Sequence, residues 1–401
     1  MKEILIFLLC LFQSILHAQQ LITGKLVERE NLNPIAFAHI SILGTSKGTV
    51  TNERGDFVLR NIGGQEINLK VSSIGYETDT VKWPLAKASD KLLIQLAPSL
   101  MELKQVDVTV VRATPEEIIE EAFSRISQNY WLDEHILTGY FKETENTNGQ
   151  PLYVAEAIIQ AKIPAKGADA DERIKIIHLA DRKKDSPDIE KWKVDYRGSG
   201  AYRCLKNSIN DPINPIYPSH FGNYTYSIEG YSDFNGKQVV IISFTDLKRK
   251  PIYGRLIIDL QSYAFVRMEG TKTHGDGSPF DKWKWTRHTW IEQYMEDENG
   301  KWLLNSSIYL GDWIMKRSMF YWINIDNNQE FQTRSYYYTT DYSKGSEFTE
   351  KGIDFRRGEE FYSRDFNNDE KYWSKFNYMV PNEAEQRILN KVEDQSGPRG
   401  N

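Results

Sequence analysis

The sequence predicts a mainly β protein, with a small N-terminal β-sandwich and a larger antiparallel sheet or half-barrel that has one helix packed on it. Short apolar segments recur about every ten residues and are separated by Gly, Asn and Pro, a pattern typical of antiparallel strands. Asn-Gly pairs stand between several of these segments, where they favour hairpin turns. The chain of 401 residues also exceeds the usual size of a single hydrophobic core, which indicates more than one domain.

Residues 1–18 have the anatomy of a secretory signal peptide. Lys2 supplies a positive charge, residues 4–16 are almost wholly apolar, and Ala18 provides a small residue at the expected cleavage point. The apolar stretch is shorter than the roughly 20 residues that a membrane-spanning helix needs. We therefore expect an exported protein of the periplasm, or of the periplasmic face of the outer membrane, without a transmembrane helix.

The two cysteines each leave an alternative open. Cys10 would be the acylated residue of a bacterial lipoprotein, but Leu8 and Leu9 stand where a lipobox has small residues, so cleavage after Ala18 is favoured. Once the signal is removed, only Cys204 remains and an intramolecular disulfide cannot form. A lone cysteine in an exported protein is either a reactive thiol or a small buried hydrophobe, and we favour the buried hydrophobe.

The composition argues for a folded protein that does not bind nucleic acid. Hydrophobic residues make up 40% of the chain and aromatic residues 12%, which is typical of a globular protein and not of a disordered one. The net charge is −6, and acidic and basic residues are interspersed. Nucleic-acid-binding surfaces instead concentrate their basic residues.

The N-terminal module is predicted over residues 19–98 as a β-sandwich. Its strand-like segments are 21–28, 35–43, 49–59, 66–74 and 91–96. Gly55 is expected to supply the positive φ of a hairpin. Gly75 is expected to mark a bulge or a close backbone contact within a strand.

Three ordered motifs of this module resemble a known family. They are Asn33-Pro34-Ile35 with Ala38 and Ile40, then Gly48-Thr49 with Thr51-Asn52, Gly55 and Phe57, then Val71-Ser72 with Ile74-Gly75-Tyr76. Together they look like the carboxypeptidase regulatory-like domain, and the resemblance implies a seven-strand-type, transthyretin-like β-sandwich with an accessory role. Such domains also stand at the N-terminus of many TonB-dependent outer-membrane transporters, but the rest of this chain is too short for their barrel and plug.

The resemblance does not imply peptidase activity, because the zinc chemistry of metallocarboxypeptidases belongs to a separate catalytic domain. The histidines of the mature chain are scattered, and the nearest pairing, His288 with Glu292, lies in a predicted strand where four residues span about 13 Å. No GxSxG elbow, P-loop, dinucleotide fingerprint or CxxC pair occurs in the sequence. We expect a non-catalytic protein with no metal or cofactor.

After a linker over residues 99–113, a helix is predicted to begin at Thr114. Thr114 is suited to cap the helix, Pro115 suits its first position, and two glutamates follow in the first turn. Apolar residues then recur at helical spacing and form one stripe. We expect this stripe to pack on the following sheet. Membrane binding is the alternative, and the acid-rich opposite face argues against it.

Residues 114–345 are predicted to contain this helix and a large antiparallel β region of about ten strands. A hairpin is expected around residues 146–149, and two-residue turns are expected at Asn235-Gly236 and Asn299-Gly300. Residues 346–401 are predicted to be a C-terminal extension that is partly disordered.

Residues 226–269 look similar to outer-membrane lipoprotein-sorting, LolA-like proteins. This resemblance implies a half-barrel curved around a helix, with an apolar cavity for acyl chains. The alternative is a sheet whose interior is filled by its own side chains.

Four residues are candidates for ligand contact. Trp283 and Trp285 stand two apart in an aromatic-rich stretch, where they either stack on a sugar ring or lipid or pack within the sheet, and we favour packing. His274 and Asp276 lie in a polar, glycine-rich segment that is either a ligand site or an ordinary turn of the chain.

Three functions remain open, and we favour the first. It is a non-catalytic envelope protein with a binding or scaffolding role toward a protein, a glycan or a lipid. The second is a LolA-like lipid or lipoprotein carrier, which requires an apolar cavity. The third is a hydrolase whose site assembles from residues far apart in the sequence, which requires a pocket with an acid–base set.

Overall fold

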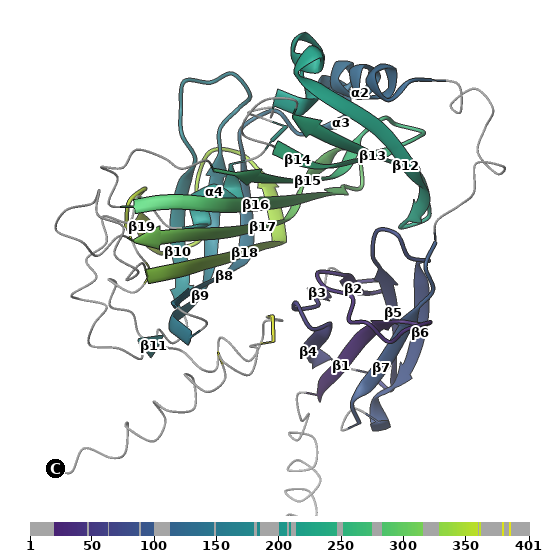
Figure 1. Ribbon diagram of the computed structural model, residues 1–401. Coiled ribbons are helices and arrows are strands. Elements are labelled where there is room, and N and C mark those ends of the chain that lie inside the picture. Colours follow the sequence, from purple (N-terminus) through teal and green to yellow (C-terminus); the bar gives the residue numbers. More distant parts are fainter. Residues whose placement is uncertain are drawn as a thin grey trace, which may run out of the picture. The chain divides into compact units, whose positions relative to one another are not determined.

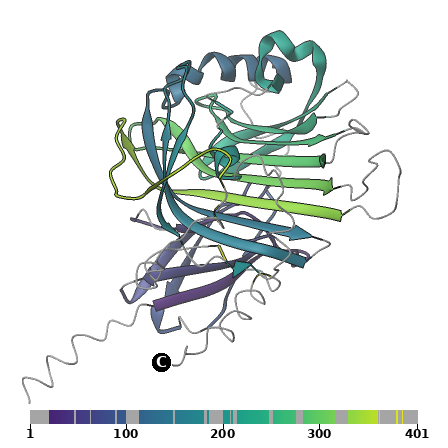
Figure 2. The same ribbon diagram turned by 90° about the vertical axis from the view of Figure 1, so that its left-hand side faces the viewer.

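In the computed structural model the chain divides into two compact units, which are described separately (Figures 1 and 2). The first unit includes residues 20–73 and 79–97, and the second includes most of the chain from residue 98 onward. The structure describes residues 20–45, 48–62, 64–87, 90–99, 113–147, 150–179, 183–184, 200–206, 208–209, 214–246, 252–274, 283–315, 329–359, 361, 379–380 and 385.

The first unit is the predicted seven-strand β-sandwich. Its strands are β1 Gln20–Glu28, β2 His39–Ile42, β3 Gly48–Val50, β4 Asp56–Ile62, β5 Glu66–Ser72, β6 Asp79–Pro84 and β7 Leu92–Leu96. They form one sheet in the order β4-β1-β7 and another in the order β3-β2-β5-β6 (Figure 1). Leu26, Phe57 and Leu69 are buried in the core that these two sheets supply.

Two glycines near these strands have the positive φ that glycine alone adopts easily. Gly55 has the predicted positive φ, 74°, in the turn before β4, but the predicted hairpin is wrong because β3 and β4 belong to different sheets. Gly75 has a φ of 85° and lies in the turn between β5 and β6, with open space where a Cβ would be. The predicted bulge or close contact at Gly75 is therefore wrong, because β5 already ends at Ser72 and the chain reverses there.

The described residues of the second unit form a 12-stranded antiparallel sheet. Its strands are β8 His135–Thr147, β9 Gln150–Ile163, β10 Arg173–Leu179, β11 Lys183–Lys184, β12 Tyr224–Phe234, β13 Lys237–Asp246, β14 Ile252–Asp259, β15 Phe265–Thr273, β16 Trp283–Glu296, β17 Trp302–Met315, β18 Gln329–Lys344 and β19 Ile353–Phe355. The order is β12-β13-β14-β15-β16-β17-β18-β8-β9-β10-β19, and β11 pairs with β9. The sheet curves along this order (Figures 1 and 2), and β18 lies beside β8 although they are far apart in sequence.

Of the two-residue turns predicted at Asn235-Gly236 and at Asn299-Gly300, the structure shows the first and not the second. Asn235 and Gly236, with φ of 57° and 82°, form the predicted two-residue turn between β12 and β13. Between β16 and β17 the loop is longer, because the Asp297 carboxylate accepts hydrogen bonds from the backbone N–H of Asn299 (2.9 Å) and of Lys301 (2.7 Å). The two-residue turn predicted at Asn299-Gly300 is therefore wrong.

The predicted helix appears as α2 Pro115–Ser124, followed by α3 Ile126–Asn129. Thr114 and Glu117 form a capping box, in which the Glu117 N–H donates to the Thr114 hydroxyl and the Thr114 N–H donates to the Glu117 carboxylate. The apolar stripe of α2 is buried and contacts β12 and the 3₁₀ helix η6 Pro218–Asn223. The stripe packs on the sheet, as expected.

A second short helix, α4 Gly200–Leu205, packs on β8, β17 and β18 (Figure 1). We call the side of the sheet that carries α4 the α4 face, and the opposite side the outer face. Beside α4 the Phe361 ring lies 4.9 Å from Phe141 and 4.3 Å from Phe355, between ring centroids. Phe141, Phe355 and Phe361 therefore form one packed aromatic group in this described part of the interior.

A strand pairing and an ion pair hold described residues beyond 345 on the sheet. β19 pairs with β10, so residues 353–355 of the predicted extension are an edge strand. Glu385 forms an ion pair of 2.6 Å with Lys142 of β8, and both side chains are almost fully buried. Within the described ranges, the helices are all too short or too polar to cross a membrane.

Candidate ligand-binding site on the α4 face

One buried carboxylate fixes the start of α4 to the sheet. Glu143 of β8 accepts hydrogen bonds from the Gly200 N–H (2.6 Å), from the Ser335 hydroxyl (3.0 Å) and from the Tyr153 hydroxyl. Burial raises the pKa of Glu143, and these three donors offset part of that effect. A Cβ at Gly200 would lie 1.8 Å from the Ser335 hydroxyl oxygen, so this close approach requires glycine.

A second buried carboxylate fixes the chain just beyond α4. Glu292 of β16 accepts hydrogen bonds from the Ser208 N–H (3.0 Å), from the Ser208 hydroxyl (2.8 Å) and from the Tyr294 hydroxyl (2.6 Å). Burial raises the pKa of Glu292 as well. Cys204 lies between the two anchored points and is fully buried, which confirms the buried-hydrophobe prediction, and burial raises the pKa of its thiol.

Arg203 projects from α4 between two aromatic rings of the sheet. Its Nη1 donates a hydrogen bond of 2.8 Å to the Tyr309 hydroxyl. Its guanidinium carbon lies 4.9 Å from the centroid of the Trp285 ring and 4.9 Å from that of the Tyr309 ring. At these distances the positive charge is attracted to both ring faces, so the rings hold the guanidinium in a defined position.

Two histidines lie next to these rings. His274 Nε2 and His288 Nδ1 are 2.8 Å apart and share a hydrogen bond. The His288 ring stacks on Tyr309, with centroids 5.9 Å apart, and lies 5.8 Å from the Trp290 ring. Burial is the largest cause that lowers the pKa of His288 to about 4, and electrostatic effects of His274, Lys272 and Arg203 contribute to the same value. His288 is therefore neutral at pH 7 and sits in a positive local field.

A β-bulge brings these rings to one face of β16. Trp285 pairs with Trp313 and Arg287 pairs with Asp312, so Thr286 is an extra residue on its strand. In a regular strand, residues three apart point to opposite faces. With the bulge, Trp285 and His288 both contact Tyr309 of the neighbouring strand.

Two strand glycines make room for the indole rings. A Cβ at Gly311 would lie 2.5 Å from the Trp285 ring, and a Cβ at Gly270 would lie 2.3 Å from the Trp290 ring. Each indole thus approaches the backbone at a position where only glycine leaves room for it. We call the six half-buried side chains on this part of the α4 face the ring cluster: Arg203, His274, Trp285, His288, Trp290 and Tyr309.

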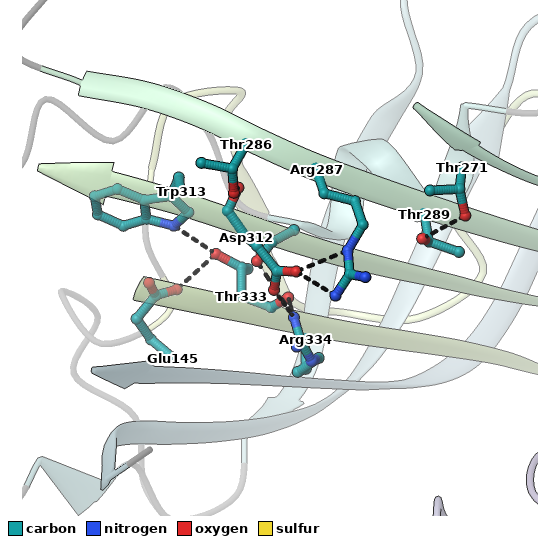
Figure 3. A network of polar contacts seen from close by, with 10 residues as sticks. Glu145, Thr271, Thr286, Arg287, Thr289, Asp312, Trp313, Thr333 and Arg334 are labelled. Atoms are coloured by element: carbon teal, nitrogen blue, oxygen red, sulfur yellow. Dashed lines mark hydrogen bonds and ion pairs between the residues drawn. The ribbon is translucent and has the colours of Figure 1, made fainter. Parts of the chain in front are cut away.

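The end of β17 continues the ring cluster into a packed polar network (Figure 3). The Trp313 ring stacks on Phe331 with centroids 4.1 Å apart. Its indole N–H donates to the Thr333 hydroxyl (3.2 Å), which donates to Glu145 (2.7 Å). These side chains are buried, in contrast to the half-buried ring cluster.

The outer face of the same strands carries an ion-pair network instead (Figure 3). Asp312 accepts from Arg287 at 2.7 Å and from Arg334 at 3.1 Å. Asp312 and Trp313 are neighbours in sequence and point to opposite faces, as alternation along a strand requires. The acidic partner of Arg287 is therefore remote from the ring cluster.

The structure brings together two of the four predicted ligand-contact residues. His274 and Trp285 both belong to the ring cluster, where His288 and Tyr309 lie between them. Trp285 packs on neighbouring rings and is still partly exposed. Trp283 is the first residue of β16, and its side chain lies outside the described residues, as does Asp276.

The sequence reasoning missed Arg203, His288, Trp290 and Tyr309. For Trp290 the sequence offered only a glycine, Gly270, inside a predicted strand, because the register that places Gly270 opposite Trp290 is known from the structure. The position of Arg203 has no such local signal. Among the described residues, His, Cys, Asp and Glu side chains do not converge in groups of three or more that could hold a metal ion.

The N-terminal module matches the model of a known protein family. Residues 22–108 match the model of the CarboxypepD_reg-like domain. The predicted carboxypeptidase regulatory-like resemblance is confirmed. This CarboxypepD_reg-like match ends before the sheet that carries the ring cluster begins. No curated protein matches the chain.

Comparison with solved structures gives weak resemblances for the rest of the chain. An outer membrane lipoprotein-sorting protein domain from Vibrio parahaemolyticus is 9% identical, covers 56% of this chain and 91% of its own, and has a TM-score of 0.25. A LolA superfamily protein from Nitrosomonas europaea is 9% identical, with 58% and 93% coverage and a TM-score of 0.21. The MucA/MucB complex of Pseudomonas aeruginosa gives 9% identity, 55% and 92% coverage and a TM-score of 0.17.

Proposed function

We propose that this chain is an exported, non-catalytic protein of the cell envelope whose larger sheet binds a ligand through the ring cluster. Export is supported by the signal-peptide anatomy of residues 1–18. The observation that carries the binding role is the ring cluster, in which a positive charge and several flat rings share one half-buried face. The CarboxypepD_reg-like module has an accessory or scaffolding role in this proposal.

The buried carboxylates support a binding role over hydrolysis. A general acid or base must be free to exchange a proton with a substrate. Glu143 and Glu292 each accept three hydrogen bonds from groups that fix the segment around α4. Both carboxylates therefore serve as anchors of the fold.

The described interior also favours ligand binding on a surface over a carrier with an acyl cavity. Phe141, Phe355 and Phe361 pack against one another beside α4. Lipid carriage would require apolar space at that position. The ring cluster, in contrast, is a half-buried surface that includes the polar side chains of Arg203, His274 and His288.

The proposal is tested with the purified mature protein and isolated envelope polymers. We expect saturable binding that decreases at least about tenfold in Arg203→Gln, with the bound polymer recovered chemically unchanged. Arg287→Gln, on the outer face, is the matched control and should bind as the wild type does. Turnover of an envelope polymer that disappears in Glu143→Gln or Glu292→Gln would overturn the proposal and favour the hydrolase.

A further inference from the structure

We propose that the ligand of the ring cluster is an acidic saccharide, that is, a sugar ring that carries a carboxylate. This inference rests on the proposed binding function and names its ligand class. Three features of the ring cluster support it: the fixed guanidinium of Arg203, the indole rings that lie beside strand glycines, and a buried indole N–H donor.

The guanidinium supplies recognition of a carboxylate. Arg203 is fixed by its hydrogen bond to the Tyr309 hydroxyl and by two rings at 4.9 Å. A planar guanidinium binds a carboxylate with charge-assisted hydrogen bonds that a point charge cannot reproduce. Lys272 pairs directly with His288 across β15 and β16 and adds a second positive charge, so an anion is favoured over a neutral group at this place.

The indole rings supply recognition of a sugar ring. The Trp285 ring lies close to Gly311 and the Trp290 ring lies close to Gly270, and both side chains are half-buried. A half-buried aromatic face stacks on the apolar C–H face of a pyranose, and its polar edge remains available for hydrogen bonds. A ligand that contacts both Arg203 and these rings must therefore combine a ring with an acidic group.

The Trp290 indole N–H is a donor that the described residues do not satisfy. Its nitrogen is buried and has no hydrogen-bond acceptor in the described part of the chain. A buried donor without an acceptor is unfavourable. A hydroxyl or ring oxygen of a saccharide would remove this penalty if binding shifts the side chains that cover the nitrogen.

The same features argue against an acyl lipid as the ligand. An acyl chain gains affinity by burial in apolar space. Three phenylalanine rings pack together beside α4, and the ring cluster itself carries Arg203 and two histidines. A ring of modest size with a carboxylate suits this surface better than a long apolar tail.

The experiment is calorimetric titration of the full mature protein with a short oligogalacturonate. A neutral galacto-oligosaccharide of equal length and phosphatidylglycerol vesicles are titrated in parallel. We expect binding of the oligogalacturonate, and binding at least about tenfold weaker for the neutral sugar. Arg203→Lys, which keeps the charge but loses the planar fork, and Trp285→Leu should each weaken binding at least about tenfold. Trp285→Phe should retain most of the affinity, because a stacking ring remains, and the exposed outer-face variant Arg287→Gln should bind as the wild type does.

Three outcomes would overturn the inference: no binding of the oligogalacturonate by folded wild-type protein, equal binding of the neutral sugar, or Arg203-dependent binding of vesicles alone. Each would leave the proposed binding function standing, because that proposal is tested separately on isolated envelope polymers and fails on turnover or on the absence of saturable, Arg203-dependent binding. Thermal unfolding of every variant checks that the fold persists. If Arg203→Lys does not fold, Trp285→Leu against Trp285→Phe decides the same question.

Discussion

At the scale of single residues, the second unit depends on charged groups that are buried and satisfied. Glu143 is the clearest case, because its three partners all donate and one of them is a backbone N–H that cannot rotate away. Such a group is costly to bury and more costly to leave half-satisfied. The start of α4 therefore depends on a single side chain of β8.

Replacement of Glu143 tests this dependence. Glu143→Ala should lower the free energy of unfolding by about 3 kcal/mol, because the Gly200 N–H loses its acceptor. Glu143→Gln should cost about 1 kcal/mol at pH 7, because its carbonyl serves Gly200 and Ser335 and the Tyr153 hydroxyl can turn to accept. Urea unfolding of both variants measures the difference. Equal loss in both would show that the hydrogen bonds do not hold α4.

The same variants give a pH dependence with a defined sign. Burial raises the pKa of Glu143 above 4.5, so the folded state binds the proton more tightly than the unfolded state. The stability that protonation of this group adds is fully present below 4.5 and is lost as the pH rises through the folded pKa. Wild type should therefore gain stability relative to Glu143→Gln as the pH falls from 8 toward 4.5. A difference that does not change with pH would contradict this assignment.

At the scale of elements, the local parts of the fold were predictable and the non-local parts were not. The helix cap at Thr114 and the turn at Asn235-Gly236 follow from residues a few positions apart, and both were predicted. The bulge at Thr286 depends on the register between β16 and β17, which single-sequence alternation does not encode. The meeting of His274 with His288 depends on the same pairing, and Arg203 depends on how α4 docks.

The need for a strand glycine beside the Trp285 ring is tested by substitution of Gly311. Gly311→Ala should place a methyl group within 2.5 Å of the Trp285 ring and push the indole off the strand. We expect a loss of about 1–2 kcal/mol in unfolding free energy, a changed tryptophan emission and weaker ligand binding. Gly222→Ala is the matched control, because a Cβ at Gly222 meets open space. Wild-type emission and stability in Gly311→Ala would show that the ring position does not require glycine.

At the scale of the second unit, the buried ion pair joins residue 385 to a long strand of the sheet. Lys142 and Glu385 lie 2.6 Å apart with side chains 2% and 7% exposed, so loss of one partner leaves a buried charge alone. The sequence alone did not predict this pair, because the two residues are 243 positions apart.

Glu385→Ala should lower the free energy of unfolding by about 3 kcal/mol, because it leaves the Lys142 ammonium buried without its partner. The double variant Lys142→Met with Glu385→Leu should recover most of that loss, because two apolar side chains carry no desolvation cost. Chemical denaturation of the three proteins measures both effects. A single variant as stable as wild type would show that the pair does not hold the C-terminal residue on the sheet.

The most direct test of the account is the titration of His288 by NMR, with and without a saturating oligogalacturonate. In the free protein we expect a midpoint of about 4, set by burial and by the charges of His274, Lys272 and Arg203. A carboxylate bound beside Arg203 should raise the pKa of His288 by about 1 unit or more, because an opposite charge favours the protonated ring. A His288 midpoint that does not move at saturating ligand would contradict the claim that the ring cluster is the binding site.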